Sequence, residues 1–414
     1  MNEATIPVSA APSVAEPATK PAEQSGVAYR ILASISVSHM LNDMMQSILI
    51  AIYPLLQGSF NLSFAQVGSI TLTYQFASSI LQPLIGHFTD KRPKPYSLCI
   101  GMGSTFCGLI LLSMAWNFPS VLVAALLIGM GSSVFHPESS RVARLASGGR
   151  HGLAQSIFQV GGNTGSSLGP LLAALIIVPH GQSSVAWFSL AALLAMFILF
   201  HVGRWYAANM TGVRGRATLS KVETGLTHKQ VKGALAVLMI LIFSKFFYLS
   251  SLTSYLTFYL IHHFGVSIQN SQYCLFVFLF GVALGTIAGG PIGDHIGRKR
   301  VILSSILGAA PFALMLPFAS LTWTIVLVFI IGVILASAFP AILVYAQELM
   351  PGKIGTVSGL FFGFAFGMAG VGAAALGSLA DMTSIEFVYQ VSAFLPLLGV
   401  AAFLLPNDEE RYRG

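Results

Sequence analysis

Three polar side chains recur at helical spacing within an apolar stretch near the start of the chain. His39, Asp43 and Gln46 stand four and three residues apart in SHMLNDMMQSILIAIYPLL, so a helix places them on one face. An ionised carboxylate in such a span costs about 2.5 kcal/mol or more, and burial favours its protonated form. We predict that Asp43 carries a proton, with His39 as partner or relay and Gln46 as a substrate contact. A static hydrogen-bonded pair that fixes helix packing is the alternative.

A second group of ionisable residues lies in VFHPESSRVAR, at the end of a later apolar run. Pro137 cannot continue the helical hydrogen-bond ladder, so protein or water must satisfy the carbonyl that it frees, which favours a cavity here. Glu138 is a candidate second protonation site, and His136 and Arg141 are candidate substrate contacts. Because Glu138 and Arg141 are three residues apart, a structural ion pair between them is the alternative.

Lys245 is the one basic residue deep inside an apolar run rather than near its end. At about 100° per residue, Tyr248 and Tyr255 lie within roughly 80° of it around a helix. A buried lysine is costly unless something negative visits it, and an ammonium with phenol donors suits a phosphonate or phosphate. We predict that these three side chains bind an anionic substrate. A permanent salt bridge from Lys245 to Asp43 or Glu138 is the alternative.

Two stripes with an interval of four residues run along the segment QSIFQVGGNTGSSLG. Gln159 and Asn163 carry amides that could contact substrate. The other stripe consists of Gly161, Gly165 and Gly169, about 160° away around the helix. We predict that the amides face a cavity while the glycines let a neighbouring helix approach closely.

The composition identifies the environment of these groups. Hydrophobic residues make up 55% of the chain and charged residues 8%, whereas soluble domains have roughly 25% charged residues. About twelve apolar runs have the length of about 20 residues that spans a bilayer as a helix. We predict membrane-spanning helices near residues 31–57, 66–88, 96–115, 119–140, 152–178, 184–206, 234–262, 271–292, 300–319, 322–347, 354–380 and 385–405.

Motifs for catalysis and for cofactors are missing from the sequence. Cys99, Cys107 and Cys274 lie in apolar runs without metal-ligand spacing, so packing roles are expected for them. We find no nucleophile motif, no metal cluster and no phosphate-binding loop, and almost no soluble chain that could house a sensor. We therefore expect no enzyme, no metal and no cofactor, and we disfavour a membrane-embedded receptor.

The net charge of +7 comes from basic residues on alternate connections. Lys and Arg follow the second, fourth, sixth, eighth and tenth runs, whereas intervening connections such as QGSFNLSFAQ and IHHFGVSIQN contain none. Cytoplasmic loops of membrane proteins are enriched in Lys and Arg. We therefore predict that both termini are cytoplasmic and that the basic residues orient the chain rather than bind nucleic acid.

The longest hydrophilic connection divides the chain into two halves that echo each other. GHFTDKRPK follows the second run and GPIGDHIGRKR follows the eighth, each with a glycine and an aspartate four residues apart. The predicted division is a disordered cytoplasmic tail at 1–27, a six-helix bundle at 28–206, a cytoplasmic linker at 207–233, a second six-helix bundle at 234–406 and a cytoplasmic tail at 407–414.

The repeated loop resembles the signature loop of the major facilitator superfamily. The resemblance implies an all-α integral membrane fold of twelve helices, arranged as two pseudo-symmetric six-helix bundles around a central cavity. The second copy is close to the superfamily pattern, whereas the first has Lys91 for the usual Arg and Pro93 for the second Gly. By the same resemblance, a conformational latch is expected at Gly86, Asp90, Lys91, Arg92, Gly290, Asp294 and Arg298.

The segment GSSLGPLLAA resembles the antiporter motif of the superfamily, which favours exchange over symport. The matching residues are Gly165, Gly169 and Pro170, and Ala173 and Ala174 replace the closing glycines.

Three longer stretches resemble superfamily members that export a phosphonate antibiotic: SHMLNDMMQSILIAIYPLL, GSSVFHPESSRVARLASGGRHGLAQSIFQVGG and ILVYAQELMPGKIGTVSGLFFGFAFGMAG. The resemblance implies a bacterial inner-membrane efflux pump that exchanges a small anionic substrate for protons. We expect it to act as a monomer in the lipid bilayer. An uptake carrier for an organic phosphate or another small organic anion is the alternative, because the same basic cavity could serve it.

Overall fold

The computed structural model describes residues 27–91, 94–148, 150–209, 226–350 and 354–407 of the 414-residue chain, and within them the secondary structure is entirely helical. The predicted tails at 1–27 and 407–414 lie almost wholly outside the described residues, as do Arg92 and most of the predicted linker at 207–233.

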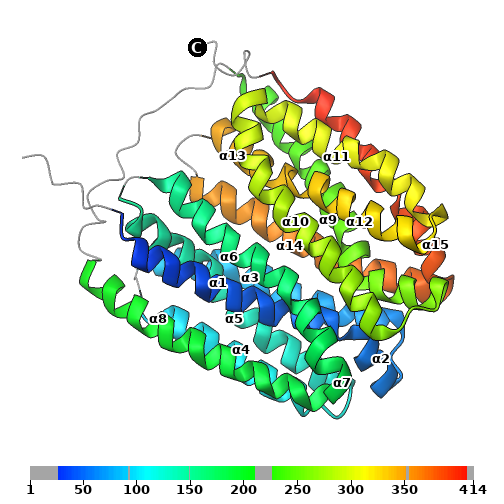
Figure 1. Ribbon diagram of the computed structural model, residues 1–414. Helices are drawn as coiled ribbons and strands as arrows, with labels where there is room; N and C mark the ends of the chain where they lie inside the picture. Colours follow the sequence, from blue (N-terminus) through cyan, green and yellow to red (C-terminus); the bar gives the residue numbers. More distant parts are fainter. Residues whose placement is uncertain (1–26, 92–93, 149, 210–225, 351–353, 408–414) are drawn as a thin grey trace, which may run out of the picture.

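Each half of the chain forms one helical bundle (Figure 1). The first bundle consists of α1 Tyr29–Ala51, α2 Tyr53–Phe60, α3 Phe64–Lys91, α4 Ser97–Ser113, α5 Phe118–Ala146, α6 His151–Leu172, α7 Val178–His180 and α8 Ser189–Asn209, with a π-helical turn at Ala173–Ile177 and a 3-10 helix at Gln182–Phe188. The second consists of α9 His228–Phe264, α10 Ile268–Ile296, α11 Arg298–Met315, α12 Leu321–Ala336, α13 Ala338–Leu349, α14 Ile354–Met382 and α15 Ile385–Ser392, with 3-10 helices at Leu316–Phe318 and Leu395–Leu404.

The helices follow the order of the predicted spans. α1 and α2 together form the first span, α12 and α13 the tenth, and α15 with the 3-10 helix after it the twelfth. Within the described residues, nine helices are long and apolar enough to cross a membrane, and α4 is a shorter apolar helix. The chain is therefore a multi-pass membrane protein, as the hydropathy pattern predicts.

Capping side chains satisfy the first backbone N–H groups of two long helices. At the start of α5, Ser120 N donates to Asn117 Oδ1 over 2.9 Å and Asn117 N donates to Ser120 Oγ over 3.2 Å. Thr227 and Gln230 form the same reciprocal cap on α9. Such caps replace the water that lipid cannot provide. α5 then continues through Pro137 without interruption.

Glycines let α1 and α6 pack with their backbones in contact. A Cβ placed on Gly161 would overlap the carbonyl oxygen of Ser36, and one on Gly165 would overlap that of Met40. Helix interfaces in membranes use small residues in this way because close backbone approach increases van der Waals contact. The glycine stripe therefore lies against a neighbouring helix, as predicted, and the structure identifies that helix as α1.

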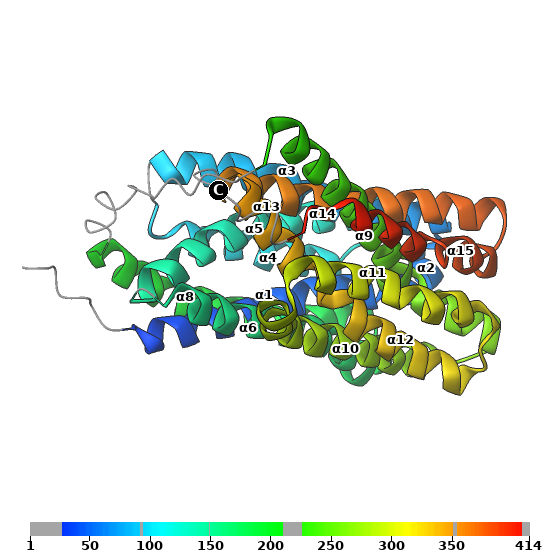
Figure 2. The same cartoon turned by 90° about the horizontal axis from the view of Figure 1, so that it is seen from above.

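Seen from above, the two bundles lie side by side, with α3 packed along α14 on one side and α6 along α10 on the other (Figure 2).

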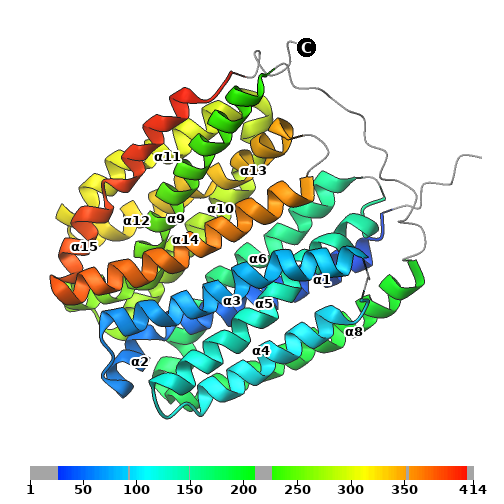
Figure 3. The ribbon, with the colours of Figure 1, turned by 180° about the vertical axis from the view of Figure 1, so that it is seen from behind.

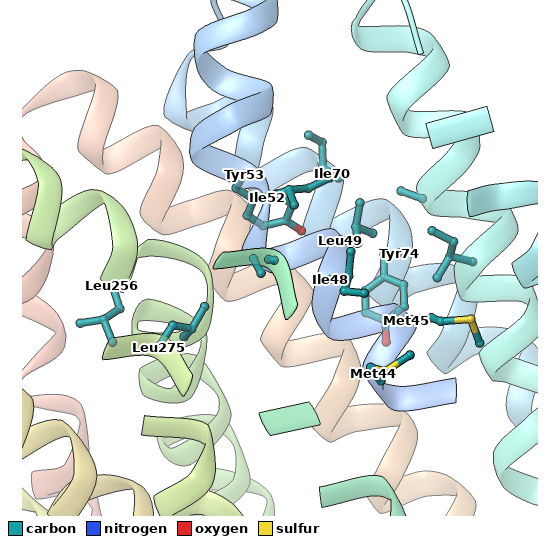
Figure 4. Close-up of a cluster of buried hydrophobic side chains, with 14 of the residues drawn as sticks. Met44, Met45, Ile48, Leu49, Ile52, Tyr53, Ile70, Tyr74, Leu256 and Leu275 are labelled. Carbon is teal, nitrogen blue, oxygen red and sulfur yellow. The ribbon is translucent and has the colours of Figure 1, made fainter. Parts of the chain in front are cut away.

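The largest hydrophobic cluster is shared by both bundles. It joins Tyr53 and Ile70 of the first bundle to Leu256 and Leu275 of the second (Figure 4). Two smaller clusters, one with Leu238 and Tyr345 and the other with Leu32 and Ala143, each stay within one bundle. The bundles thus share a core at one end and have separate cores at the other.

The contact between α3 and α14 is likewise close at one end of the molecule and loose at the other. A Cβ on Gly68 would overlap the backbone of α14, and one on Gly377 would overlap that of α3. Farther along, a Cβ on Gly367 would stay 4.0 Å from Ser79 Oγ, and one on Gly359 would meet nothing within 4 Å among the described residues. The two helices run side by side in Figure 3 and touch most closely where α3 begins, which is the closed end of the molecule.

Replacing Gly165 by Ala should destabilise the protein by about 1–3 kcal/mol, because the added methyl group overlaps the Met40 carbonyl and forces α1 and α6 apart. Thermal unfolding of the purified protein in detergent measures the change. The matched control is Gly359→Ala, which adds the same atoms where there is open space and should have no destabilising effect. Equal stability of Gly165→Ala and Gly359→Ala would contradict the packing described here.

Candidate functional site

His39 is fixed by contacts with α6. Its Nδ1 lies 2.8 Å from the carbonyl oxygen of Phe158, and its ring stacks on the Phe158 ring with centroids 4.0 Å apart. On the other side of the imidazole, Nε2 lies 3.2 Å from Asp43 Oδ2. Because a carbonyl oxygen can only accept, Nδ1 carries the hydrogen and Nε2 faces the carboxylate.

A single proton can lie between the facing atoms of His39 and Asp43. With a proton on Nε2 the pair is an imidazolium and a carboxylate, and with a proton on Oδ2 it is a neutral imidazole and a carboxylic acid. In both arrangements a donor faces an acceptor, whereas loss of the proton leaves two acceptors facing each other at 3.2 Å. The sequence prediction that these residues share a helix face is confirmed, and their contact supports a role in proton binding.

His136 of α5 completes a group that we call the His–Asp–His cluster, consisting of His39, Asp43 and His136. His136 Nε2 lies 4.0 Å from Asp43 Oδ1, which also accepts from Asn42 Nδ2 over 3.0 Å. The side chains of Asp43 and His136 are 17% and 22% exposed, so the protein does not fully enclose this group. The His136 ring lies 6.3 Å from the Phe366 ring of α14, so the cluster borders the second bundle.

The donor set of the cluster also has the types found in divalent metal sites. The ligand atoms of His39, Asp43 and His136 all lie within 4.8 Å of one another.

Gly162 of α6 leaves the space that the His39–Asp43 pair occupies, since a Cβ there would lie 2.5 Å from His39 Nε2 and 2.8 Å from Asp43 Oδ2. A side chain at this position would therefore displace the pair.

Glu138 and Arg141 form an ion pair, with Arg141 Nη1 3.0 Å from Glu138 Oε1. Glu138 is fully buried, and Ser97 Oγ lies 3.4 Å from its other oxygen. The ion pair that the spacing allowed is therefore present.

Lys245 is buried in α9 with only 4% of its surface exposed. Its Nζ lies 5.3 Å from the ring centroid of Phe246 and 5.4 Å from that of Phe339 in α13. Among the residues that the structure describes, no carboxylate forms an ion pair with Lys245, so the alternative of a permanent bridge to Asp43 or Glu138 is not found. Cation–π contacts stabilise the ammonium only partly, which leaves it suited to an anion.

Aromatic rings connect Lys245 with the His–Asp–His cluster. The Phe339 ring lies 5.0 Å from that of Phe362 in α14, and the Phe362 ring lies 6.0 Å from that of Phe366. Since Phe366 borders His136, the row runs from Lys245 in the second bundle to the His–Asp–His cluster in the first.

The remaining predicted substrate contacts differ in their surroundings. Tyr248 is buried, and its hydroxyl has no hydrogen-bond partner within the described residues; the same holds for Asn163 Nδ2 and Gln46 Nε2, and Gln159 is partly buried. Gln46 Oε1 accepts a hydrogen bond from Tyr74. The Tyr255 hydroxyl is already engaged, since it donates to the Ala373 carbonyl over 2.5 Å at the closed end.

The predicted latch is described only in part. α3 extends to Lys91 and α10 to Ile296, so the helices reach these segments, but the side chains of Asp90, Lys91 and Asp294 lie outside the described structure, as do the surroundings of Gly86 and Gly290. Arg298 is described, and its Nη2 lies 2.7 Å from Glu348 Oε1 of α13. The antiporter-like segment lies in α6, where Gly169 contacts Ser47 of α1 and Pro170 precedes the π-helical turn.

Comparison with known proteins identifies the family. The profile of the Major Facilitator Superfamily matches residues 35–374 and, in a second match, residues 240–414. The chain belongs to the major facilitator superfamily. The twelve-helix, two-bundle fold expected from the sequence is thereby confirmed, and the protein is a transporter rather than an enzyme.

Individual relatives support the same assignment. The chain is 63% identical over 383 residues to the fosmidomycin resistance protein of Escherichia coli (strain K12), a match that covers 92% of this chain and 94% of that protein. It is 44% identical over 385 residues to the uncharacterised MFS-type transporter YfnC of Bacillus subtilis (strain 168), covering 92% and 94% of the two chains.

Solved structures share the major facilitator fold. A bacterial homologue of the human lysosomal transporter Spinster gives a TM-score of 0.73 at 13% identity, covering 95% of this chain and 99% of that one. The nucleoside transporter NupG gives a TM-score of 0.71 at 13% identity, covering 90% and 98%.

Sequence reasoning missed several residues of the site. The Gly-Gly pair in QVGGN was a signal for close helix approach, but Gly162 was not identified as the residue that borders His39 and Asp43. Phe158, Phe339 and Phe366 carry no chemical signal in the sequence, because apolar aromatic residues are common throughout a membrane protein.

Replacing Glu138 by Ala should destabilise the protein by about 3 kcal/mol, since it leaves Arg141 without its ion-pair partner in a low-dielectric interior. A double-mutant cycle with Arg141→Ala, read by thermal unfolding in detergent, should show less than additive losses. Arg144→Ala, an exposed arginine one turn along α5, is the control and should stay within about 0.5 kcal/mol. Additive losses would mean that the pair contributes no coupling.

Proposed function

We propose that this protein exports the phosphonate antibiotic fosmidomycin across the bacterial inner membrane in exchange for protons. The observation that carries the proposal is the similarity to the fosmidomycin resistance protein over nearly the whole chain. A resistance function favours export over the uptake of an organic phosphate or another small organic anion. Related small anionic or amphiphilic compounds that fit the same site are further substrates.

The closed end of the molecule is proposed to face the periplasm. Connections without Lys or Arg, such as the one between α9 and α10, lie at this end, and the basic connections lie at the other. This orientation puts both termini in the cytoplasm. The two bundles, residues 28–206 and 234–406, would then rock against each other around a central site in a protein that acts as a monomer.

The His–Asp–His cluster is the proposed proton site. Within the His39–Asp43 pair a donor faces an acceptor only with one proton bound, which suits reversible uptake and release. Once Asp43 has lost the proton, its remaining donor is Asn42 unless His136 closes the 4.0 Å gap. Proton release is therefore coupled to a movement of α5 towards α1.

Lys245 is the proposed anchor for the phosphonate. Its charge has no carboxylate partner among the described residues, and the Tyr248 hydroxyl lies one turn along the same helix face without an acceptor. An anion at this position would gain a charge-assisted hydrogen bond from Nζ. His136, Arg141, Gln46, Gln159, Asn163 and Tyr255 stay as predicted substrate contacts.

Exchange follows if the proton and the phosphonate bind in alternation. The row of Phe339, Phe362 and Phe366 lies between Lys245 and His136, so the ammonium itself does not contact the cluster. Instead, each occupant acts on the helices that carry its site, which are α1 and α5 for the proton and α9 and α13 for the phosphonate. Each ligand thereby favours a different arrangement of the helices.

Replacing Asp43 by Asn should abolish proton coupling, because the amide keeps a hydrogen bond to His39 but binds no proton. In inside-out vesicles we expect the accumulation of labelled fosmidomycin driven by a pH gradient to fall to background, while counterflow without a gradient persists. Glu386→Gln, which removes a partly exposed carboxylate of α15, is the control and should retain both activities. Full proton-driven transport by Asp43→Asn would disprove the assignment.

Replacing Lys245 by Gln should raise the half-saturating fosmidomycin concentration about 10- to 100-fold, since a hydrogen bond to a charged group contributes about 1.5–3 kcal/mol. Transport kinetics in proteoliposomes measure the effect. Lys245→Arg keeps the charge and should lose less. Lys232→Gln changes an exposed lysine of the same helix and should have no effect. An unchanged half-saturating concentration in Lys245→Gln would remove Lys245 from the binding site.

A further inference from the structure

Asp381 bridges the two bundles at the closed end. It is the penultimate residue of α14, and its Oδ1 accepts a hydrogen bond from Phe64 N over 2.8 Å while its Oδ2 accepts one from Ala65 N over 2.7 Å. Phe64 and Ala65 are the first two residues of α3. One carboxylate of the second bundle thus caps the N-terminus of a helix in the first.

The cap matches the chemistry of a helix start. The first N–H groups of α3 have no acceptor within their own helix, and the helix dipole gives them a partial positive charge. A carboxylate that accepts from two of them forms charge-assisted hydrogen bonds, which are stronger than bonds between neutral groups. Asp381 is exposed, so water can replace these bonds once the bundles part. The bonds are therefore reversible.

Other contacts between the bundles surround the cap. The Tyr255 hydroxyl of α9 lies 3.4 Å from the Phe64 carbonyl of α3. The Phe64 ring packs edge-on against Phe258, with centroids 5.4 Å apart. Deeper in the molecule, Thr71 Oγ1 of α3 lies 3.4 Å from Ser254 Oγ of α9. All of these contacts must break if this end is to open.

We propose that Asp381 is a positioning residue for transport, acting as a clasp that holds this end of the molecule closed. It touches neither the cluster nor Lys245, and it acts by setting how readily α3 and α14 separate. Asp90 occupies the equivalent sequence position in the partner helix: it is the penultimate residue of α3, as Asp381 is of α14, and it lies at the opposite end of the helix pair. The clasp is independent of the identity of the cargo, so its test does not depend on fosmidomycin.

The test measures how readily the closed end opens. Thr71→Cys places a reporter thiol at a position that is 2% exposed, in a chain whose three native cysteines are replaced by Ser. Labelling by a membrane-impermeant maleimide is followed in right-side-out and inside-out vesicles. Reading both kinds of vesicle tests the clasp whichever way the protein faces.

Asp381→Asn should raise the labelling rate from the side of Asp381 by about fivefold or more, because the charge-assisted bonds are lost. Asp381→Glu keeps the carboxylate and should restore a rate near that of the parent. The matched control is Glu386→Gln, which removes a carboxylate at the same end that faces His263 of its own bundle, and it should leave the rate unchanged.

Ala65→Pro tests the same bonds from the other bundle. Proline is tolerated in the first turn of a helix but has no N–H, so this variant deletes one donor and leaves Asp381 in place. It should also raise the rate, and Asp381→Asn combined with Ala65→Pro should label no faster than Asp381→Asn alone. An unchanged rate in both single variants, an equal rise in Glu386→Gln, or fully additive effects would overturn the proposal.

Discussion

The free-energy cost of holding an ionised group away from water governs this molecule. Each described ionisable side chain deep within the bundles meets that cost in a different way. Asp43 lies 3.2 Å from His39, Glu138 pairs with Arg141, and Lys245 lies against two phenyl rings. The first arrangement is suited to a proton and the last to an anion. The groups that are most costly to bury are therefore those that a proton or an anion can stabilise.

Close packing of α1 against α6 fixes the positions of His39 and Asp43. Glycines bring the two backbones together, and Gly162 leaves room for the imidazole and the carboxylate. The carbonyl of Phe158 accepts a hydrogen bond from His39 Nδ1, so Nε2 is the nitrogen that faces Asp43. A second partner that fixes the tautomer of a functional histidine is a common feature of such sites. The glycine-rich α6 thus contributes to the chemistry although its glycines carry no functional group.

The arrangement of the hydrophobic cores makes the two ends of the molecule unequal. At the closed end both bundles contribute to one core, and direct hydrogen bonds join α3, α9 and α14. At the other end each bundle has a core of its own. Opening the closed end exposes apolar surface and breaks a limited set of polar contacts between the bundles. The helices themselves do not have to unfold for this change.

The sequence by itself determined the membrane environment, the helix order and the polar stripe of His39 and Asp43, because hydropathy and helical period are local properties of the chain. It also suggested the Glu138–Arg141 pair, whose residues are neighbours on one helix. Only the tertiary structure decided that His39 bonds to a carbonyl 119 residues away, that Lys245 meets Phe339 instead of a carboxylate, and that Asp381 caps α3. Those contacts depend on how helices from distant parts of the chain pack, and residue spacing within one helix carries no information about its neighbours.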